Sequence, residues 1–258
     1  MFRKTIVYHI STLLMILLLS TSSLAMTDWQ KLSPGIEYID LGSTILSPWS
    51  HIHTFKIDIE KHDLDLILAS SFAKPYASAY QFAKKSKAII AINGGFFDKS
   101  NIPLGLRISN YHQFSPLKRI SWWGVFYIKN QKPKIVSVNN FKGDDNVDFA
   151  IQAGPRLLIN GEIPRLKVGI AERSAIGISP DGKVIILVTE NSPMTTTALA
   201  KIMKSWPINC KNALNLDGGS SSQIFAHINK FKLNVHGLSN VSDAIIVKSN
   251  KTLASSKT

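Results

Sequence analysis

Hydrophobic and polar residues alternate in short runs along most of this chain, a spacing that predicts β-strands. In residues 51–59, isoleucine and phenylalanine side chains alternate with polar ones, as in a half-buried strand. Residues 88–92 are uniformly apolar, which predicts a strand covered on both faces. The clearest hairpin spans residues 173–189, with its turn at Pro180-Asp181-Gly182.

Further hairpins are predicted at residues 122–138 and 223–235, and Asn160-Gly161 predicts a tight turn. Residues 149–152 and 156–159 read as two short strands broken by Ala153-Gly154-Pro155.

Helical spacing occurs at two places. Residues 77–85 predict a first helix, and an apolar stripe at i, i+3, i+4 and i+7 over residues 199–206 predicts a second. Threonines at 195–197 offer N-cap oxygens for the second helix. Many strands, few helices and mostly hairpin connections indicate an α+β fold. We expect a largely antiparallel or mixed β-sheet core with a few flanking helices, in a single domain.

The N-terminus reads as a targeting segment. Arg3 and Lys4 precede an apolar run, and Ser23-Leu24-Ala25 resembles a cleavage site, so we expect residues 1–25 to be a signal peptide. Residues 26–258 would then form the exported domain, periplasmic or secreted, with its core at about 50–248. No later run approaches the roughly 20 apolar residues that a membrane span needs, so we expect no stable span.

The chain is strongly basic, with 30 Lys and Arg against 17 Asp and Glu and a net charge of +13. Most of this charge suits solubility, but it also favours anionic partners. In an exported protein we expect a phosphorylated carbohydrate or envelope glycan rather than nucleic acid. The single Cys210 excludes an intrachain disulfide. The oligomeric state is open.

Common catalytic signatures are absent from the sequence: it has no GxSxG, P-loop, HExxH or GxGxxG pattern. The seven histidines form no convincing metal-ligand set. We therefore expect no metal site and no cofactor, although isolated acids such as Asp98 leave a bound divalent cation open.

The most informative stretch is 212–222, where an apolar run ends at Asp217, followed by Gly218-Gly219 and then three serines. A buried strand would deliver Asp217 to a sheet edge, and the glycines would let a ligand approach the backbone. Freed N–H groups and serine hydroxyls could hold phosphate or sugar oxygens. The alternative is a surface turn in which Asp217 accepts N–H bonds from its own turn.

Three further strand ends carry polar residues, mostly beside glycines: Asn93-Gly94-Gly95, Gln152-Ala153-Gly154-Pro155 and Arg173. Together, and in this order, these stretches resemble the phosphodiester glycosidase family, which is related to the mannose 6-phosphate uncovering enzyme. The resemblance covers about residues 85–248 and is carried by residues 91–97, 152–155, 172–178 with 181–182, and 213–221.

Two departures from the family pattern stand out. Ser220 occupies a position where the family commonly has a third glycine, and Ser239-Asn240-Val241-Ser242 stands where an arginine is expected. These departures bear on substrate and activity more than on fold.

The resemblance implies hydrolysis of a sugar-1-phosphodiester at the anomeric carbon. Asp217 would act as base or nucleophile, Arg173 would bind the phosphate with Arg107 as a second candidate, and Glu190 would be the second carboxylate. Several residues would position the substrate: Asn93, Gly94, Gly95, Gln152, Gly218, Gly219, Ser220 and Ser221.

Two other functions fit the same residues. One is a non-catalytic binding protein for anionic cell-envelope glycans. The other is a phosphodiesterase that cleaves the P–O bond, which would normally use a pair of metal ions.

Overall fold

The computed structural model describes residues 28–42, 47–143 and 146–249; the predicted signal peptide lies outside them. Strands dominate this part of the chain, which contains only two α-helices, α2 (Ala79–Ser86) and α3 (Thr196–Lys204). Both were predicted, but each is short. The fold is therefore mainly β, and the expected α+β class overstated the share of helix.

The strands of the described chain are β1 (Gln30–Ser33), β2 (Ile36–Asp40), β3 (His51–Ile57), β4 (His62–Leu68), β5 (Ile90–Asn93), β6 (Arg107–Ser109), β7 (His112–Ser115), β8 (Gly124–Lys129), β9 (Lys132–Ser137), β10 (Phe149–Ala153), β11 (Arg156–Leu158), β12 (Ile170–Ala171), β13 (Ser174–Ile178), β14 (Val184–Glu190), β15 (Met194–Thr195), β16 (Asn212–Asn215), β17 (Ile224–Ile228), β18 (Phe231–Val235) and β19 (Asp243–Ser249). Short 3₁₀ turns lie at Ala69–Phe72, Val138–Asn140 and Gly219–Ser221.

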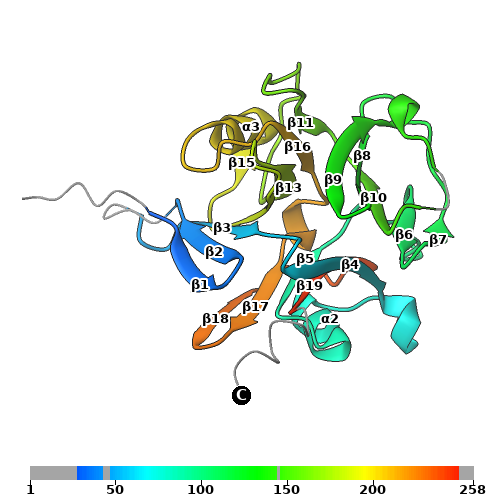
Figure 1. Cartoon of the computed structure of the whole chain (residues 1–258), viewed down its shortest axis with the longest axis horizontal. Helices are drawn as coiled ribbons and strands as arrows, with labels where there is room; N and C mark the ends of the chain where they lie inside the picture. The colour runs from blue at the N-terminus through cyan, green and yellow to red at the C-terminus, as the bar shows by residue number, and fades with distance from the viewer. Residues whose placement is uncertain (1–27, 43–46, 144–145, 250–258) are drawn as a thin grey trace, which may run out of the picture.

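Three sheets make up most of the structure (Figure 1). A seven-stranded sheet has the order β1-β2-β3-β14-β13-β16-β11, and two five-stranded sheets have the orders β7-β6-β10-β8-β9 and β18-β17-β5-β19-β4. The short strands β12 and β15 form a separate pair. Every one of these pairings is antiparallel, which confirms the antiparallel part of the prediction.

One hydrophobic core joins the three sheets. It contains Phe55 of β3, Ile92 of β5 and Phe126 of β8, each fully buried. Helix α3 covers the outer face of the seven-stranded sheet, and α2 covers the sheet that contains β5 and β19 (Figure 1). Burial of both faces explains why residues 88–92 are uniformly apolar.

The predicted hairpins are confirmed. Strands β13 and β14 pair around residues 179–183, β8 and β9 pair around 130–131, and β17 and β18 pair around 229–230. Asn160 and Gly161 have φ angles of 52° and 87°, the left-handed pair that a tight hairpin turn requires. The turn at Asn160-Gly161 could be predicted because asparagine and glycine are among the few residue types that adopt positive φ at low cost.

The Gly154-Pro155 break separates two sheets. Strand β10 lies in the sheet with β6 and β8, whereas β11 is the edge strand of the seven-stranded sheet beside β16. The chain therefore passes from one sheet to another at the point where the predicted site residues gather.

Candidate active site

The three sheets meet where β5 and β10 end, where β13 begins and just beyond the end of β16. Asn93, the last residue of β5, is fully buried at this junction. Its amide Nδ2 donates to the Asp217 carbonyl at 2.8 Å, and its Oδ1 accepts from Ser174 Oγ at 2.6 Å and from Gln223 N at 3.1 Å. Asn93 thus holds the Asp217 backbone in place; its side chain is not exposed to a ligand.

Gly94 and Gly95 pack against a buried ion pair. The Arg107 Nε lies 3.2 Å from Asp243 Oδ1, and both side chains are fully buried, although the N–H does not point along a hydrogen bond. Backbone N–H groups of both glycines donate to Asp243, from Gly94 to its carbonyl and from Gly95 to its Oδ1. A Cβ on Gly94 would lie 1.8 Å from Asp243 Oδ1, so no side chain fits there.

The substitution Gly94→Ala is therefore expected to destabilise the protein by about 1–3 kcal/mol or more, since the added methyl overlaps a buried carboxylate. Urea unfolding measures this change. Gly169→Ala is the control, because a Cβ at Gly169 would meet no atom within 4 Å, and we expect a change within about 0.5 kcal/mol. Equal stability of the two variants would contradict the packing described here.

Arg107 and Gln152 both have structural positions. The Arg107 guanidinium is fully buried and donates to the carbonyls of Phe96 at 3.2 Å and Gln152 at 3.1 Å. The Gln152 side chain accepts from the backbone N–H groups of Leu106 and Lys118. Neither residue lines the cleft described next, so we assign both to its support and not to direct substrate contact.

A cleft of about 550 Å³ lies beside this junction. Among its described lining residues, Arg165, Lys167 and Arg173 carry positive charge, and Asp217 carries the single carboxylate. The cleft is lined by Phe96, Trp122, Gly154, Pro155, Arg165, Lys167, Val168, Gly169, Ala171, Arg173, Thr196, Asn215, Asp217, Gly218 and Gly219. It therefore combines one acid with three cations, a charge balance that suits an anionic ligand.

Asp217 lies just beyond the end of β16, as predicted, and is partly buried. Burial raises the pKa of its carboxyl, and the charge of Asp243 raises it further. Hydrogen bonds from Ser221 and from the Gly218 N–H, together with the charge of Arg107, oppose this rise in the pKa. A carboxyl with a raised pKa can exchange protons closer to neutral pH than an ordinary aspartate.

Arg173 reaches the same cleft and is nine-tenths buried. Its Nε donates to the Met194 carbonyl at 2.8 Å, and its Nη2 donates to the Gly169 carbonyl. None of the hydrogen bonds identified for this residue uses Nη1, and a Cβ built on Gly218 would lie 3.9 Å from that atom. The guanidinium is thus held in one orientation with Nη1 near the Asp217-Gly218 turn, which brings two predicted residues together.

The glycine turn uses most of its own N–H groups. Gly218 N–H donates to the Asp217 carboxylate, Gly219 N–H to the Glu172 carbonyl at 2.7 Å and Ser221 N–H to the Gly218 carbonyl. These N–H groups shape the turn, and ligand oxygens would compete with existing partners. Gly218 and Gly219 line the cleft, whereas Ser220 and Ser221 do not belong to its lining.

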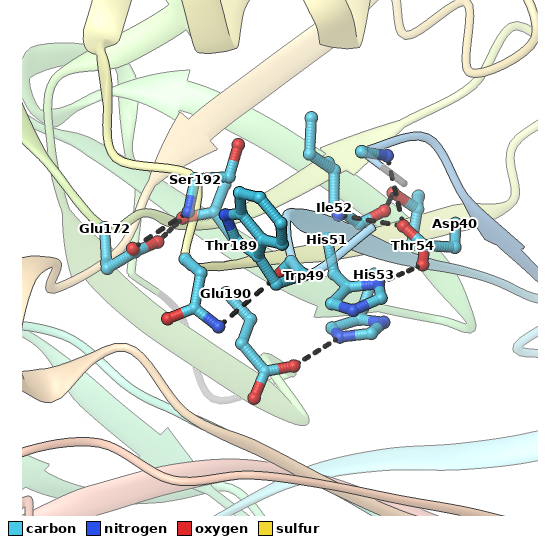
Figure 2. A network of polar contacts seen from close by, with 12 residues as sticks. Asp40, Trp49, His51, Ile52, His53, Thr54, Glu172, Thr189, Glu190 and Ser192 are labelled. Carbon is cyan, nitrogen blue, oxygen red and sulfur yellow. Dashed lines mark hydrogen bonds and ion pairs between the residues drawn. The ribbon is translucent and has the colours of Figure 1, made fainter. Parts of the chain in front are cut away.

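Glu190 lies in a different polar network (Figure 2). Its carboxylate is 3.0 Å from His53 Nε2, and His53 Nδ1 is 2.8 Å from the Tyr38 hydroxyl. The His51 ring stacks on that of His53 and bonds to Asp40. Glu190 is not among the residues that line the cleft, so the structure does not bring it to Asp217.

Sequence reasoning missed several residues at the site. Asp243 gave no signal, because a single acid before an apolar strand is common. Asn215 lines the cleft, and its Nδ2 donates to the carbonyls of Gly154 and Leu216, while its buried Oδ1 has no hydrogen-bond partner among the described residues. Arg165 and Lys167 looked like ordinary solubility charges.

The two departures from the family pattern touch each other. The Ser239 N–H donates to the Ser220 carbonyl at 2.9 Å, and neither residue lines the cleft. The departures therefore lie next to each other, and neither Ser220 nor Ser239 contributes to the lining of the cleft in this protein.

Two features are absent from the described residues. No group of three or more His, Cys, Asp or Glu side chains in this part of the chain is arranged to hold a metal ion. Within the same residues, no helix has the length and apolar character of a membrane span.

Two structural relatives share the fold. The catalytic domain of zebrafish N-acetylglucosamine-1-phosphodiester alpha-N-acetylglucosaminidase, auto-inhibited by its pro-peptide, is 20% identical with a TM-score of 0.64 over 83% of this chain and 82% of that one. A hypothetical protein from Synechocystis is 17% identical with a TM-score of 0.62 over 84% of this chain and 63% of that one. At these identities the likeness concerns the fold alone.

A curated relative is similar in sequence. The uncharacterized protein YigE of Escherichia coli strain K12 is 36% identical over 115 residues, which are 40% of this chain and 45% of that protein. The match thus spans less than half the length of this relative.

The family model of the phosphodiester glycosidases (NAGPA) matches residues 86–248, nearly the range over which the resemblance was predicted. This match covers well over half of the 258-residue chain. The protein therefore belongs to the phosphodiester glycosidase family.

Proposed function

We propose that this protein is an exported glycosidase that hydrolyses a sugar-1-phosphodiester at the anomeric carbon, on an envelope or scavenged glycan phosphate. The observation that carries the proposal is the shared cleft, in which Asp217 is the single carboxylate of the described lining and Arg173 is one of three cations. A phosphodiester supplies the negative charge that such a cleft favours, and a sugar supplies the reacting carbon.

Hydrolysis of a sugar-1-phosphodiester requires few catalytic groups beyond a carboxylate and a cation. A phosphate monoester departs as an anion, so protonation of the leaving oxygen is less necessary than for an alkyl glycoside. Water adds to the anomeric carbon, the C–O bond to phosphate breaks, and the proton of the water passes to a base and then to solvent. Arg173 would stabilise the charge that develops on phosphate, and Asp217 would act at the oxocarbenium-like centre.

Two roles for Asp217 are chemically consistent with its position. As a general base it would activate water and the first-formed sugar would have inverted configuration; as a nucleophile it would give retention. Proton NMR of the first-formed anomer distinguishes these roles.

The direct test uses an α-N-acetylglucosamine-1-phosphodiester as first probe, chosen because the zebrafish relative is named for acting on such a bond. We expect release of free sugar and a phosphomonoester. Binding without turnover of this probe and of other glycosyl-1-phosphodiesters would contradict the proposal and favour a glycan-binding protein. Release of sugar-1-phosphate with loss of activity in chelator would instead indicate P–O cleavage.

Arg173→Lys is expected to lower kcat/KM by about 10–100-fold, because lysine keeps the charge but loses the planar, fixed donors of the guanidinium. Steady-state kinetics with the same diester measures the loss. Arg165→Lys is the matched control at an exposed position of the same cleft, where we expect a smaller effect. Equal kcat/KM values for Arg173→Lys and wild type would contradict the proposed role of Arg173 in binding the phosphate.

The pH dependence follows from Asp217. Its carboxyl must be ionised to act as base or nucleophile, and burial raises its pKa. Activity should therefore rise with pH through an apparent pKa above about 3.9, the ordinary value for aspartate. A profile of kcat/KM against pH measures this acid limb, and a limb at or below the ordinary value would contradict the described environment of Asp217.

We also propose that residues 1–25 direct export and are then removed, which would place the enzyme in the periplasm or outside the cell. Cell fractionation of the full chain should find a processed form outside the cytoplasm, while a chain lacking residues 1–25 stays inside. Cytoplasmic retention of the full chain would overturn this part.

A further inference from the structure

One wall of the cleft is a strap, residues 163–169, that precedes β12. Ile163 and Leu166 point inward and pack against the core cluster beneath α3. Thr196 Oγ1 donates to the Lys167 carbonyl at 3.0 Å, and Arg173 Nη2 donates to the Gly169 carbonyl. Two side chains and two carbonyl groups of the strap are therefore held by the rest of the fold. These contacts fix the positions of its outward-facing residues.

Those outward-facing residues are both basic and apolar. Arg165 and Lys167 are exposed, and Val168 is 92% exposed although it lines the cleft. Ile170, the next residue but one, is 73% exposed. Isolated exposed apolar residues such as Ile170, which lies outside the lining, need no explanation, but Val168 lines the cleft directly beside Lys167.

A second part of the cleft lining is also apolar and exposed. Trp122 lines the cleft with 53% of its surface exposed, and its ring meets the buried Trp123 ring edge to face at a centroid distance of 5.7 Å. Trp123 in turn packs against Phe96 at 5.0 Å. Trp122 is thus supported from behind and presents a flat apolar surface to whatever enters.

These walls do not match a ligand that is polar throughout. A sugar ring could stack on Trp122, but sugar hydroxyls would gain little from Val168. An anionic head group fits Arg165 and Lys167, and an apolar chain fits Trp122 and Val168, with the long cationic side chains covering part of it.

On this basis, and resting on the proposed function, we infer that the cleft takes an amphiphilic phosphodiester. Its sugar would lie toward Asp217 and its phosphate beside Arg173, Arg165 and Lys167. The second ester group would be an apolar alcohol seated between Trp122 and Val168.

Two esters of one glycosyl-1-phosphate test this inference, a methyl ester and an octyl ester, both kept below the micelle concentration. We expect kcat/KM to be about tenfold or more higher for the octyl ester, equivalent to about 1.4 kcal/mol. In Trp122→Ala and Val168→Ser, the ratio of kcat/KM for the octyl ester to kcat/KM for the methyl ester should fall toward one. Trp49→Ala is the matched control, because Trp49 is 63% exposed but does not line the cleft.

A binding experiment keeps the inference testable if no ester is hydrolysed. Calorimetry on Asp217→Asn compares octyl phosphate with methyl phosphate, and we expect about tenfold tighter binding of octyl phosphate, weakened in Lys167→Ala. Equal affinity for the two phosphates would overturn the inference even if the diesters are turned over. A loss in Trp122→Ala that is equal for both esters would also overturn it, and would assign Trp122 to the sugar.

If no ester is hydrolysed but octyl phosphate binds more tightly than methyl phosphate, the proposed enzymatic function is contradicted. The inference that the cleft binds an amphiphilic phosphate is then supported. The two claims therefore fail on different results.

Discussion

Replacing Asp217 with asparagine should reduce kcat by about 10²–10⁴-fold, the typical contribution of a positioned acid–base group. The reason is local: Asp217 is the single carboxylate among the described residues that line the cleft, so no neighbour there can take over its role. Asparagine keeps an oxygen to accept the Gly218 N–H, which lies 3.1 Å from Asp217 Oδ1, so the turn should persist. Steady-state kinetics on the phosphodiester probe measures the change.

The same variant should be at least as stable as wild type at pH 7. Because the folded-state pKa of Asp217 is raised, the folded protein binds this proton more tightly than the unfolded chain does. The stability that protonated Asp217 contributes is therefore present below its unfolded pKa and is lost as pH rises through the raised folded pKa. In urea unfolding, the free energy of unfolding of Asp217→Asn should increase relative to that of wild type as pH rises through that range.

Glu190→Gln provides the matched carboxylate control, since Glu190 bonds to His53 away from the cleft. We expect this variant to retain most of its activity. Strong loss in Glu190→Gln together with normal activity in Asp217→Asn would reverse the assignment.

Breaking the buried pair of Arg107 and Asp243 should have the largest effect on stability. In Arg107→Met, Asp243 would keep a buried negative charge without its cation, which typically costs about 3–5 kcal/mol. The pair joins β6 of one five-stranded sheet to β19 of the other, so its loss should also loosen the junction beneath Asp217. The free energy of unfolding in urea measures the cost.

Two comparisons control this prediction. Glu162→Gln breaks the exposed pair with Lys204, whose side chains are 85% and 44% exposed, and should change stability by less than about 1 kcal/mol. The double variant Arg107→Met/Asp243→Asn should be more stable than Arg107→Met, because it leaves no unpaired charge. Similar unfolding energies for Arg107→Met and Glu162→Gln would show that the buried pair does not hold the sheets together.

Local structure was largely predictable because its causes lie close together in the sequence. The apolar stripe of α3, the turn at Asn160-Gly161 and the hairpin of β13 and β14 each depend on neighbouring residues. The position of Asp217 just after a buried strand was predictable for the same reason. The arrangement of three sheets around one core could not be predicted, because the residues of a strand do not determine which other strand pairs with it.

The roles of strand-end polar residues were harder to predict. A polar residue beside glycines has the same pattern whether it faces a ligand or a neighbouring sheet. Asn93 and the residues around Arg107 face other parts of the fold. The Asn93 side chain bonds to the carbonyl of Asp217, 124 positions away along the chain. Gly95, which lies beside Arg107 in the structure, bonds to the side chain of Asp243, 148 positions away. Such contacts come from sheet packing, which the sequence pattern does not encode.

Glu190 likewise lies away from the cleft. It follows the predicted strand over residues 183–189, and this position suggested a second carboxylate at the site. Its side chain instead meets His53, because Glu190 pairs with His51 of β3 on the other side of β14 (Figure 2). A position at the end of β14 therefore did not bring the Glu190 side chain into the lining of the cleft.

The central claim concerns which bond breaks, and hydrolysis in ¹⁸O-labelled water tests it most directly. If water attacks the anomeric carbon, mass spectrometry will find the label in the released sugar and none in the phosphomonoester. Label in a phosphate group, with the oxygen of the sugar unchanged, would show P–O cleavage and contradict the account.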